Sequence, residues 1–374
     1  MIFTTIILFA LVLGLLVFAH ELGHFLAARK MGMKVEEFGF GFPPRIFGFK
    51  RKETVYSINW IPFGGFVKIL GENGDTAETG SFSTKPVWQR FIVLVAGVSM
   101  NMVLAWLLLT VVLSIGLPSQ ITEGEILPKN ATISSPQIMI QYVEPDSPAG
   151  LAGLRPGDVV LSVEGNAVET VQQLQDYTGA NAGRKLRYQL LRGSETYERD
   201  LIPRVSPPPG QGPLGIQPAL TAKIKYPVLS AAYHAIGITL SLAVQIIIAL
   251  GQLIKSLFGD RSLLGSLTGP VGIAVMTHQA AKLGLSNLIY FTSVLSVNLA
   301  IINALPFPAL DGGRILFLFI EKLRRRKLAE KFENYANTLG FLLLISLVVW
   351  ITTRDVGRFS TQFSELWRRI VGIF

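Results

Sequence analysis

Residues 1–24 read MIFTTIILFALVLGLLVFAHELGH. The segment from Met1 to Ala19 carries no charged residue and has about the length that a helix needs to cross a bilayer. His20 and His24 are four residues apart, so on a helix both imidazoles lie on one face and can reach one metal ion. Glu21 stands beside them and can take a proton from a water bound to that metal. The stretch therefore predicts a first transmembrane helix over residues 1–32 with a zinc-hydrolase motif inside it.

The motif has a second interpretation, because His-Glu-x-x-His also occurs by chance on the surfaces of soluble helices. Here the three polar side chains follow an apolar run, where unpaired ionisable groups are costly and usually serve a function. A catalytic zinc site needs a third protein ligand and leaves the fourth position to water. That third ligand decides between the two interpretations.

The composition is that of an integral membrane protein with room for one modest soluble domain. Of 374 residues, 50% are hydrophobic and only 16% are charged, and the mean hydropathy is +0.45. There is no cysteine, which excludes disulfides and thiolate metal ligands. The net charge of +9 is explained by basic cytoplasmic loops rather than by nucleic-acid binding. No basic segment precedes the first apolar run and no cleavage site follows it, so we expect this helix to be retained.

The order of apolar and polar segments predicts about four transmembrane helices. The predicted regions are a first helix at 1–32, a membrane-associated β-rich loop at 33–70, a second helix at 88–118, a soluble domain at 135–222, an interfacial helical segment at 226–259, a third transmembrane segment at 283–320 and a fourth helix at 334–353. The basic segments 29–90 and 321–327 indicate the cytoplasmic side, which places the soluble domain outside. If residues 226–259 crossed the membrane, segment 321–327 would lie outside, so we expect them to skim the outer interface.

The loop at 33–70 differs from its surroundings. Val35–Phe40 and Thr54–Trp60 have strand-like composition, and the loop is rich in glycine and phenylalanine. A β-rich loop at membrane depth must be covered by protein or by a water-filled cavity. Its strand edge could pair with an extended substrate, although a simple membrane anchor is the alternative.

The segment 135–222 has alternating strand patterns, tight glycine turns and one short helix near Val171–Tyr177, and it looks like a PDZ domain. Leu214, Gly215 and Ile216 resemble the apolar-Gly-apolar loop whose backbone amides hold a peptide C-terminus in such domains. A folded spacer that binds no peptide is the alternative.

The third ligand is expected near the end of the chain. Asp311 follows residues 283–310, which carry no charged side chain, and an aspartate in that setting needs a partner or a metal. Pro306 and Pro308 forbid a continuous helix there, and broken helices at membrane depth commonly build binding sites. Two histidines and one carboxylate make a catalytic zinc set, while a helix cap is the alternative role for Asp311.

The chain resembles the site-2 protease family, in its bacterial regulator-of-sigma-E branch. The resemblance rests on the motif in residues 20–24, the loop at 33–70, the single PDZ-like segment and Leu310–Gly313. The resemblance implies an α-helical polytopic protein of the bacterial cytoplasmic (inner) membrane with an extracytoplasmic PDZ domain. It implies zinc intramembrane proteolysis of single-pass membrane substrates, such as an anti-sigma factor or a signal-peptide remnant. His20, His24 and Asp311 would bind Zn²⁺, with Glu21 as the general base.

The same resemblance implies that Asn298, Asn303 and the β-rich loop hold an unwound substrate. Two departures are visible. The family's Gly-Pro-x-x-Asn element reads Gly97-Val98-Ser99-Met100-Asn101 here, and only one PDZ domain fits where several relatives have two. The PDZ domain would either bind a new C-terminus left by an earlier cut or exclude substrates with bulky outer domains.

Two other functional classes compete with a protease. A catalytically silent membrane scaffold would recruit partners through the PDZ domain, but it would not need Glu21 and Asp311. A zinc transporter would need polar residues along several helices, and residues 91–117 and 334–353 offer almost none.

Overall fold

The computed structural model describes residues 2–72, 74, 78–121, 130–193, 195–257, 259 and 267–358. The chain divides into two compact units. The first unit comprises residues 1–109, 235–279 and 290–374, and the second comprises residues 110–234 and 280–289. Each unit is considered by itself below.

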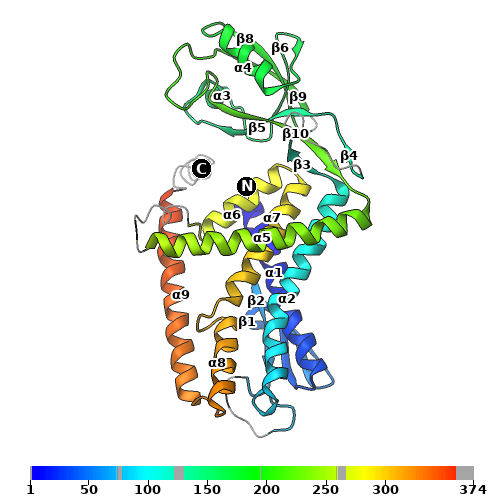
Figure 1. Ribbon diagram of the computed structural model, residues 1–374, viewed down its shortest axis with the longest axis vertical. Helices are drawn as coiled ribbons and strands as arrows, with labels where there is room; N and C mark the ends of the chain where they lie inside the picture. Colours follow the sequence, from blue (N-terminus) through cyan, green and yellow to red (C-terminus); the bar gives the residue numbers. More distant parts are fainter. Residues whose placement is uncertain are drawn as a thin grey trace. The chain divides into compact units, whose positions relative to one another are not determined.

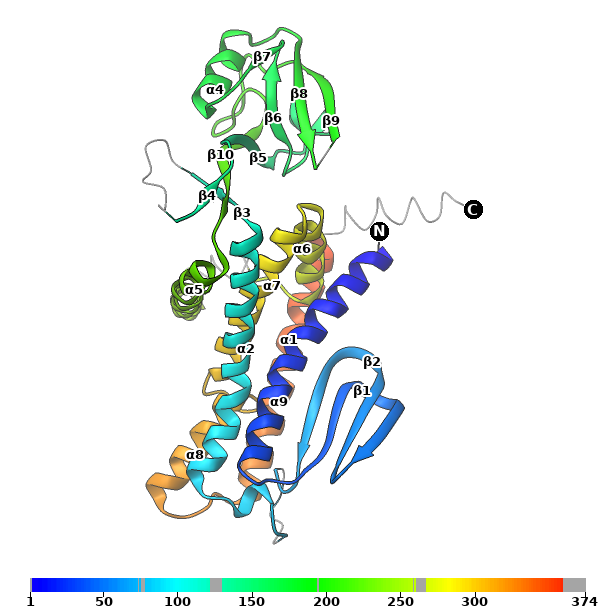
Figure 2. The ribbon, with the colours of Figure 1, turned by 90° about the vertical axis from the view of Figure 1, so that its right-hand side faces the viewer.

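The first unit is built mainly from apolar helices. Its helices are α1 (Ile2–Lys30), most of α2 (Val87–Ile115) and α5 (Val228–Leu257), much of α6 (Pro270–Lys282) and α7 (Leu285–Ala304), then α8 (Asp311–Arg324) and α9 (Glu330–Arg358). Figure 2 shows α1, α2 and α9 with their axes roughly aligned. In both views α1 and α7 run in one direction, whereas α2 and α9 run in the other. This alternation is what four successive membrane crossings require.

Helix α5 is oriented differently. In the described part of the chain, five helices are long and apolar enough to cross a membrane, and α5 is one of them. Figure 1 shows α5 lying across α2 and α7 rather than along them. Ala243 of α5 packs there against Ala105 of α2 and Val297 of α7. Length and apolarity therefore do not distinguish α5 from the other four helices, but its orientation does.

The β-rich loop forms two long antiparallel strands, β1 (Val35–Arg51) and β2 (Thr54–Ile69). The early part of β1 pairs on one side with the end of β2 and on its other side with the start of β2, so residues 64–69 form one edge of the sheet. The strands continue beyond the short stretches expected from composition, and β1 passes through Pro43 and Pro44 with shifts in register. The buried Asn59 side chain donates to the Gly41 carbonyl at 3.1 Å, which supports the backbone at this bend.

A hydrophobic cluster joins the end of α1 to the sheet and to the later helices. Its buried members are Phe25, Ala28, Met33, Val35, Ile69, Phe82, Val93, Leu94 and Leu318. They come from α1, β1, β2, the short 3₁₀ helix Phe82–Thr84, α2 and α8. Burial of this apolar surface stabilises the arrangement that surrounds the polar groups of α1.

The loop between α7 and α8 places Asp311 at the first position of α8. Ala309 has a positive φ of 76°, and its backbone N–H donates to Asn337 Oδ1 of α9 at 3.1 Å. A Cβ on Gly312 would lie 2.2 Å from the Leu305 carbonyl oxygen, and one on Gly313 would lie 2.3 Å from that of Phe307. The two glycines therefore allow α8 to start directly against the loop.

The second unit contains a small α+β domain. Its elements are β3 (Leu117–Gln120), β4 (Thr132–Ile133), β5 (Gln137–Val143), α3 (Pro148–Leu151), β6 (Val159–Val163), β7 (Asn166–Ala167), α4 (Val171–Ala180), β8 (Leu186–Arg192), β9 (Glu195–Leu201) and β10 (Ile216–Lys225). The strand order is β3-β10-β5-β6-β8-β9, with β4 added to β10 and β7 to β6. Strand β10 is thus brought beside β5, far from it in sequence. Figure 1 shows α4 in this domain.

A buried carboxylate organises one corner of this domain. Asp158 is 1% exposed, and its oxygens accept from Arg192 Nε at 2.6 Å, Arg192 Nη2 at 2.7 Å, Tyr197 Oη at 2.7 Å and the Arg155 N–H at 2.8 Å. Burial by itself raises the pKa of Asp158, but these four hydrogen bonds outweigh it and hold the pKa below its ordinary value. The carboxylate is therefore charged in the folded domain at neutral pH.

We expect Asp158→Asn to destabilise this domain by about 2 kcal/mol at pH 7, because Arg192 loses the negative charge that it pairs with and one of the two acceptor oxygens becomes an amide group that cannot accept. The folded-state pKa lies below the unfolded value of about 4, so this stabilisation is full above that value and declines as the pH falls toward the folded pKa. Scanning calorimetry of both detergent-solubilised chains should show a difference in Tm that is constant from pH 7 to 5 and shrinks at lower pH. A difference that grows on acidification would contradict the prediction.

Candidate metal centre

The two histidines of α1 lie side by side in the first unit. His20 and His24 are each 8% exposed, and their Nε2 atoms are 3.2 Å apart. One helical turn separates them, so the α1 backbone alone brings both rings to one place.

Asp311 reaches the same place from the start of α8. Its Oδ2 atom lies 3.0 Å from His20 Nε2 and 3.3 Å from His24 Nε2. Zinc bonds of about 2.0–2.1 Å in tetrahedral geometry put ligand atoms about 3.3 Å apart. The three separations of 3.0, 3.2 and 3.3 Å therefore fit one face of a zinc tetrahedron.

The protonation of these groups also favours a cation among them. His24 Nδ1 lies 2.8 Å from the Val93 carbonyl oxygen of α2, to which only a protonated nitrogen can donate. In a neutral His24, Nε2 then carries a lone pair and cannot donate to Asp311. Asp311 Oδ2 is buried without a hydrogen-bond partner among the described atoms. The lone pair of His24 Nε2 and those of Asp311 Oδ2 repel at 3.3 Å, and a bound metal ion removes that repulsion.

Asn101 of α2 supports His20 on the side away from Asp311. The Asn101 amide nitrogen lies 3.3 Å from His20 Nδ1, and its Oδ1 is buried without a partner among the described atoms. When His20 binds a metal through Nε2, its hydrogen is on Nδ1, and a half-turn of the amide brings Oδ1 to accept it. Ser296 of α7 donates to the Asn101 carbonyl at 2.8 Å, which ties α7 to this part of α2.

Helix α2 passes very close to the two histidines because it has glycine at the crossing. A Cβ on Gly97 would lie 2.3 Å from His24 Nε2 and 2.8 Å from His20 Cε1. A Cβ on Gly23 of α1 would lie 2.3 Å from the Ala96 carbonyl oxygen. These contacts leave no room for a side chain at position 97 of α2 or at position 23 of α1.

The Glu21 side chain lies next to the sheet. A Cβ on Gly65 of β2 would lie 3.8 Å from Glu21 Cγ, so the edge strand formed by residues 64–69 passes the Glu21 side chain. The structure thus places a carboxylate one residue from the proposed ligand His20 and next to an unpaired strand edge.

The other predicted residues make no described contact with this group. Asn298 and Asn303 are half-buried on α7, and neither is among the described contacts of His20, His24 or Asp311. Leu214, Gly215 and Ile216 belong to the second unit. The Leu214 side chain packs in the core of that domain, and Gly215 has a φ of +72° with no room for a Cβ against Ser147. Only backbone groups of these two residues could meet a peptide.

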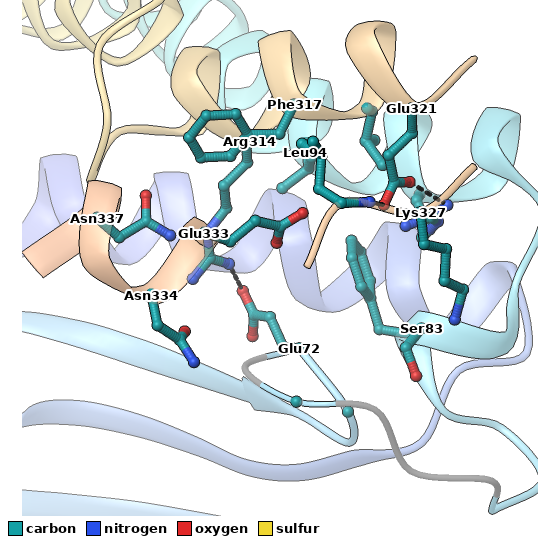
Figure 3. Close-up of a pocket in the computed structure, with 16 residues that line it drawn as sticks. Glu72, Ser83, Leu94, Arg314, Phe317, Glu321, Lys327, Glu333, Asn334 and Asn337 are labelled. Carbon is teal, nitrogen blue, oxygen red and sulfur yellow. Dashed lines mark hydrogen bonds and ion pairs between the residues drawn. The ribbon is translucent and has the colours of Figure 1, made fainter. Parts of the chain in front are cut away.

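A polar cavity of about 80 Å³ lies next to the start of α8 (Figure 3). Arg314, three residues after Asp311, donates to Glu72, which follows β2. On another side Arg90 of α2 donates to Glu321 of α8 at 2.8 Å, and both side chains are buried. Breaking a buried ion pair leaves an uncompensated charge, so this pair holds α8, and with it Asp311, against α2.

The supporting residues Gly97 and Asn101 have a spacing that could have revealed them. They are four residues apart in a long apolar helix, so they share one face, and that face meets the histidines. The sequence left the role of this segment uncertain. The Glu72–Arg314 and Arg90–Glu321 pairs join segments far apart in the sequence and left no such signal.

Residues 8–347 match Peptidase family M50. A protein of Clostridium perfringens is 35% identical over 94% of this chain and 98% of its own length. A zinc metalloprotease of Geobacillus kaustophilus named RasP is 30% identical, and the regulator of sigma-W protease RasP of Bacillus subtilis is 29% identical, each over 95% of this chain and 98% of the relative. Among solved structures, the PDZ domain of an SdrC-like protein from Listeria monocytogenes matches 25% of this chain and 93% of its own, with 20% identity and a TM-score of 0.20.

Proposed function

Because the chain belongs to peptidase family M50 and is a multi-pass membrane zinc metalloprotease, we propose that it cuts peptide bonds in or near the transmembrane segments of single-pass membrane proteins. The observation that carries the proposal is the meeting of His20, His24 and Asp311 within 3.3 Å of one another inside a bundle of apolar helices. A hydrolytic site at that place acts on a substrate that enters from the bilayer.

We assign Zn²⁺ binding to His20, His24 and Asp311, with Asn101 and the Val93 carbonyl orienting the two imidazoles. The metal, when bound, supplies Lewis-acid polarisation of the scissile carbonyl and acidifies a water. Glu21 accepts the proton of that water at its carboxylate as the water oxygen attacks the peptide carbon. Glu21 then delivers the proton to the leaving amine nitrogen.

A helical substrate must unwind before it can be cut, because its peptide groups are hydrogen-bonded within the helix. The edge strand at residues 64–69 runs past Glu21 and offers unpaired backbone groups to an extended peptide. Asn298 and Asn303 of α7 would provide amide groups to further peptide bonds of the unwound segment.

The topology that fits this activity has α1, α2, α7 and α9 as spans and α5 at the outer interface. The orientation of α5 across α2 and α7 supports this assignment, as do the basic residues at the ends of α1 and α8. With four spans the second unit lies outside the bacterial cytoplasmic membrane, and the ends of α1 and α8 lie in the cytoplasm.

The substrate class follows from the relatives and from the second unit. One relative is named a regulator of sigma-W protease, so we propose a single-pass anti-sigma regulator or a signal-peptide remnant as substrate. The second unit selects it as a PDZ-like domain. It either captures a new C-terminus at Leu214–Ile216, the loop that leads into β10, or excludes substrates with bulky outer domains. Deleting residues 135–222 abolishes cleavage in the first case and permits cleavage of untrimmed substrates in the second.

The proposal is tested with purified, detergent-solubilised full-length protein and a single-pass reporter substrate. We expect one zinc per wild-type chain and cleavage within the reporter's membrane segment. Asp311→Ala should lose both, whereas Asp146→Ala, which removes a carboxylate from the second unit, should lose neither. A wild-type chain that folds without binding zinc would overturn the metal assignment and favour the scaffold.

A further inference from the structure

A second cavity lies where α1 ends, away from the metal centre. Its volume is about 460 Å³, and its lining comes from the end of α1, the start of β1 and the turn that joins β1 to β2. The lining residues are Arg29, Met33, Val35, Arg51, Lys52, Glu53, Thr54 and Tyr56. Neither the zinc site nor the cleavage mechanism uses this cavity.

The walls of the cavity are fixed by contacts that join its two halves. Thr54 Oγ1 donates to the Val35 carbonyl at 2.9 Å, which ties the β1–β2 turn to the first residue of β1. Arg51 pairs with Thr54 across the turn, so Lys52 and Glu53 form its tip. Met33 and Val35 are 4% and 2% exposed and belong to the hydrophobic cluster beneath. The basic residues of the turn are thereby held close to the end of α1.

Arg29 is oriented by the aromatic residues beside it. Its guanidinium carbon lies 5.5 Å from the centre of the Phe25 ring, one turn earlier on α1. The Phe25 ring packs edge-on against Tyr56 of β2 at 6.0 Å, and Tyr56 lines the cavity. The position of the Arg29 side chain is therefore set by its contact with the Phe25 ring.

The charges at the cavity are unbalanced. Arg29, Arg51 and Lys52 line it together with one carboxylate, that of Glu53, and Lys30 and Lys50 flank the lining residues in sequence. Within the described residues, none of these five cations has an ion pair to a carboxylate. Elsewhere on the same sheet the basic side chains of Arg45 and Lys68 are paired, with Glu37 and Glu36. The excess positive charge is thus specific to the cavity.

The surroundings of the cavity indicate where its ligand comes from. The apolar segment of α1 ends at Arg29 and Lys30. The β1–β2 sheet exposes Phe42, Phe47, Phe49 and Trp60, which are 46%, 57%, 53% and 68% exposed. Exposed aromatic side chains of this kind favour the interface of a bilayer. The cavity therefore lies at the boundary between apolar and charged surface, at the level of lipid headgroups.

We propose that this cavity binds the headgroup of an anionic phospholipid. Arg29 and Arg51 donate to the phosphate oxygens, Lys52 adds a third cation from the turn, and the acyl chains lie along α1 and the exposed aromatic residues. Guanidinium groups match phosphate oxygens in geometry, and an unpaired cation cluster beside a membrane span is the arrangement that attracts anionic lipid. The bound lipid would hold the β1–β2 turn against the end of α1.

The test measures lipid binding to the full-length protein in neutral detergent by native mass spectrometry. The probes are phosphatidylglycerol and phosphatidylcholine. The variant is Arg29→Gln/Arg51→Gln/Lys52→Gln. The matched control, Arg155→Gln/Arg184→Gln/Lys225→Gln, removes three exposed cations of the second unit. Each cation near a membrane surface contributes roughly fivefold, so we expect the variant to bind phosphatidylglycerol about 100-fold more weakly. The control should bind it like the wild type, and phosphatidylcholine should bind weakly to all three.

Inorganic phosphate distinguishes a lipid site from a site for soluble anions. We expect phosphate at 10 mM, a concentration about ten-thousandfold above a micromolar Kd, to leave phosphatidylglycerol binding unchanged. Displacement of the lipid by phosphate would overturn the lipid assignment, and so would equal lipid binding by the variant and the wild type. Retained zinc shows that the variant is folded. If the triple variant loses zinc, the double variant Arg51→Gln/Lys52→Gln at the exposed turn replaces it. We expect the double variant to bind phosphatidylglycerol about 25-fold more weakly than the wild type.

Discussion

Replacing Glu21 with glutamine is expected to reduce the cleavage rate by about 10²–10⁴-fold while the chain keeps its zinc. Glutamine has nearly the same shape as glutamate, so it fits the same space next to β2. It cannot accept a proton from water at neutral pH, which removes the general base and nothing else. His20, His24 and Asp311 are unchanged, so zinc content should stay at that of the wild type.

The measurement pairs cleavage of the single-pass reporter with zinc analysis of the same preparations. Glu78→Gln serves as the control, because it removes a carboxylate that is 63% exposed and pairs only with Lys34 at 3.9 Å in the described structure. The control should cleave like the wild type. Near wild-type cleavage by Glu21→Gln would contradict the assignment of Glu21 as the general base. Loss of zinc from that variant would show instead that Glu21 helps to form the metal site.

The second large effect is expected from a single methyl group on α2. Gly97→Ala should lose most of its zinc, and with it its activity, because the added Cβ would lie 2.3 Å from His24 Nε2. Real Cβ atoms do not approach other atoms that closely, so the imidazole or the helix must move. Alanine favours a helix over glycine by about 1 kcal/mol, so α2 itself is not weakened. Loss of zinc would therefore come from the site and not from unfolding of α2.

Gly237→Ala is the matched control, since Gly237 is also a helical glycine but a Cβ there meets nothing within 4 Å. Zinc content is measured by mass spectrometry, and folding by the Tm of the detergent-solubilised chain. The control should keep its zinc with an unchanged or higher Tm. A Gly97→Ala chain with wild-type zinc affinity would show that α2 does not pass the histidines as closely as the structure has it.

Short-range patterns made the core of the site predictable. His20, Glu21 and His24 lie within one helical turn, so their spacing alone specifies a shared face. Asp311 could be proposed because an aspartate after an apolar run is costly without a metal or a partner. Its approach to the histidines depends on α8 being held by Glu321 and Arg90 and by the glycines that follow it, which no local pattern encodes.

The β-rich loop and α5 show the limits of composition. Composition predicted short strands at Val35–Phe40 and Thr54–Trp60, yet β1 continues through Pro43 and Pro44, because register shifts against β2 absorb the missing donors. Helix α5 is as apolar as a spanning helix, and the case for an interfacial position rested on the placement of basic loops. Composition measures how apolar a helix is, whereas its orientation is set by the helices on which it packs.

The order of the proposed ligands along the chain has a consequence for biosynthesis. His20, Glu21 and His24 are in α1, which leaves the ribosome long before α8, and Asp311 arrives only with α8, after the whole second unit has been made. A nascent chain that has not reached α8 has the base and two ligands, but it lacks the carboxylate that completes the set. Such a chain shares the membrane with unrelated nascent proteins and cannot cut them. Splitting the proposed ligands between α1 and α8 thus delays activity until α8 has been made.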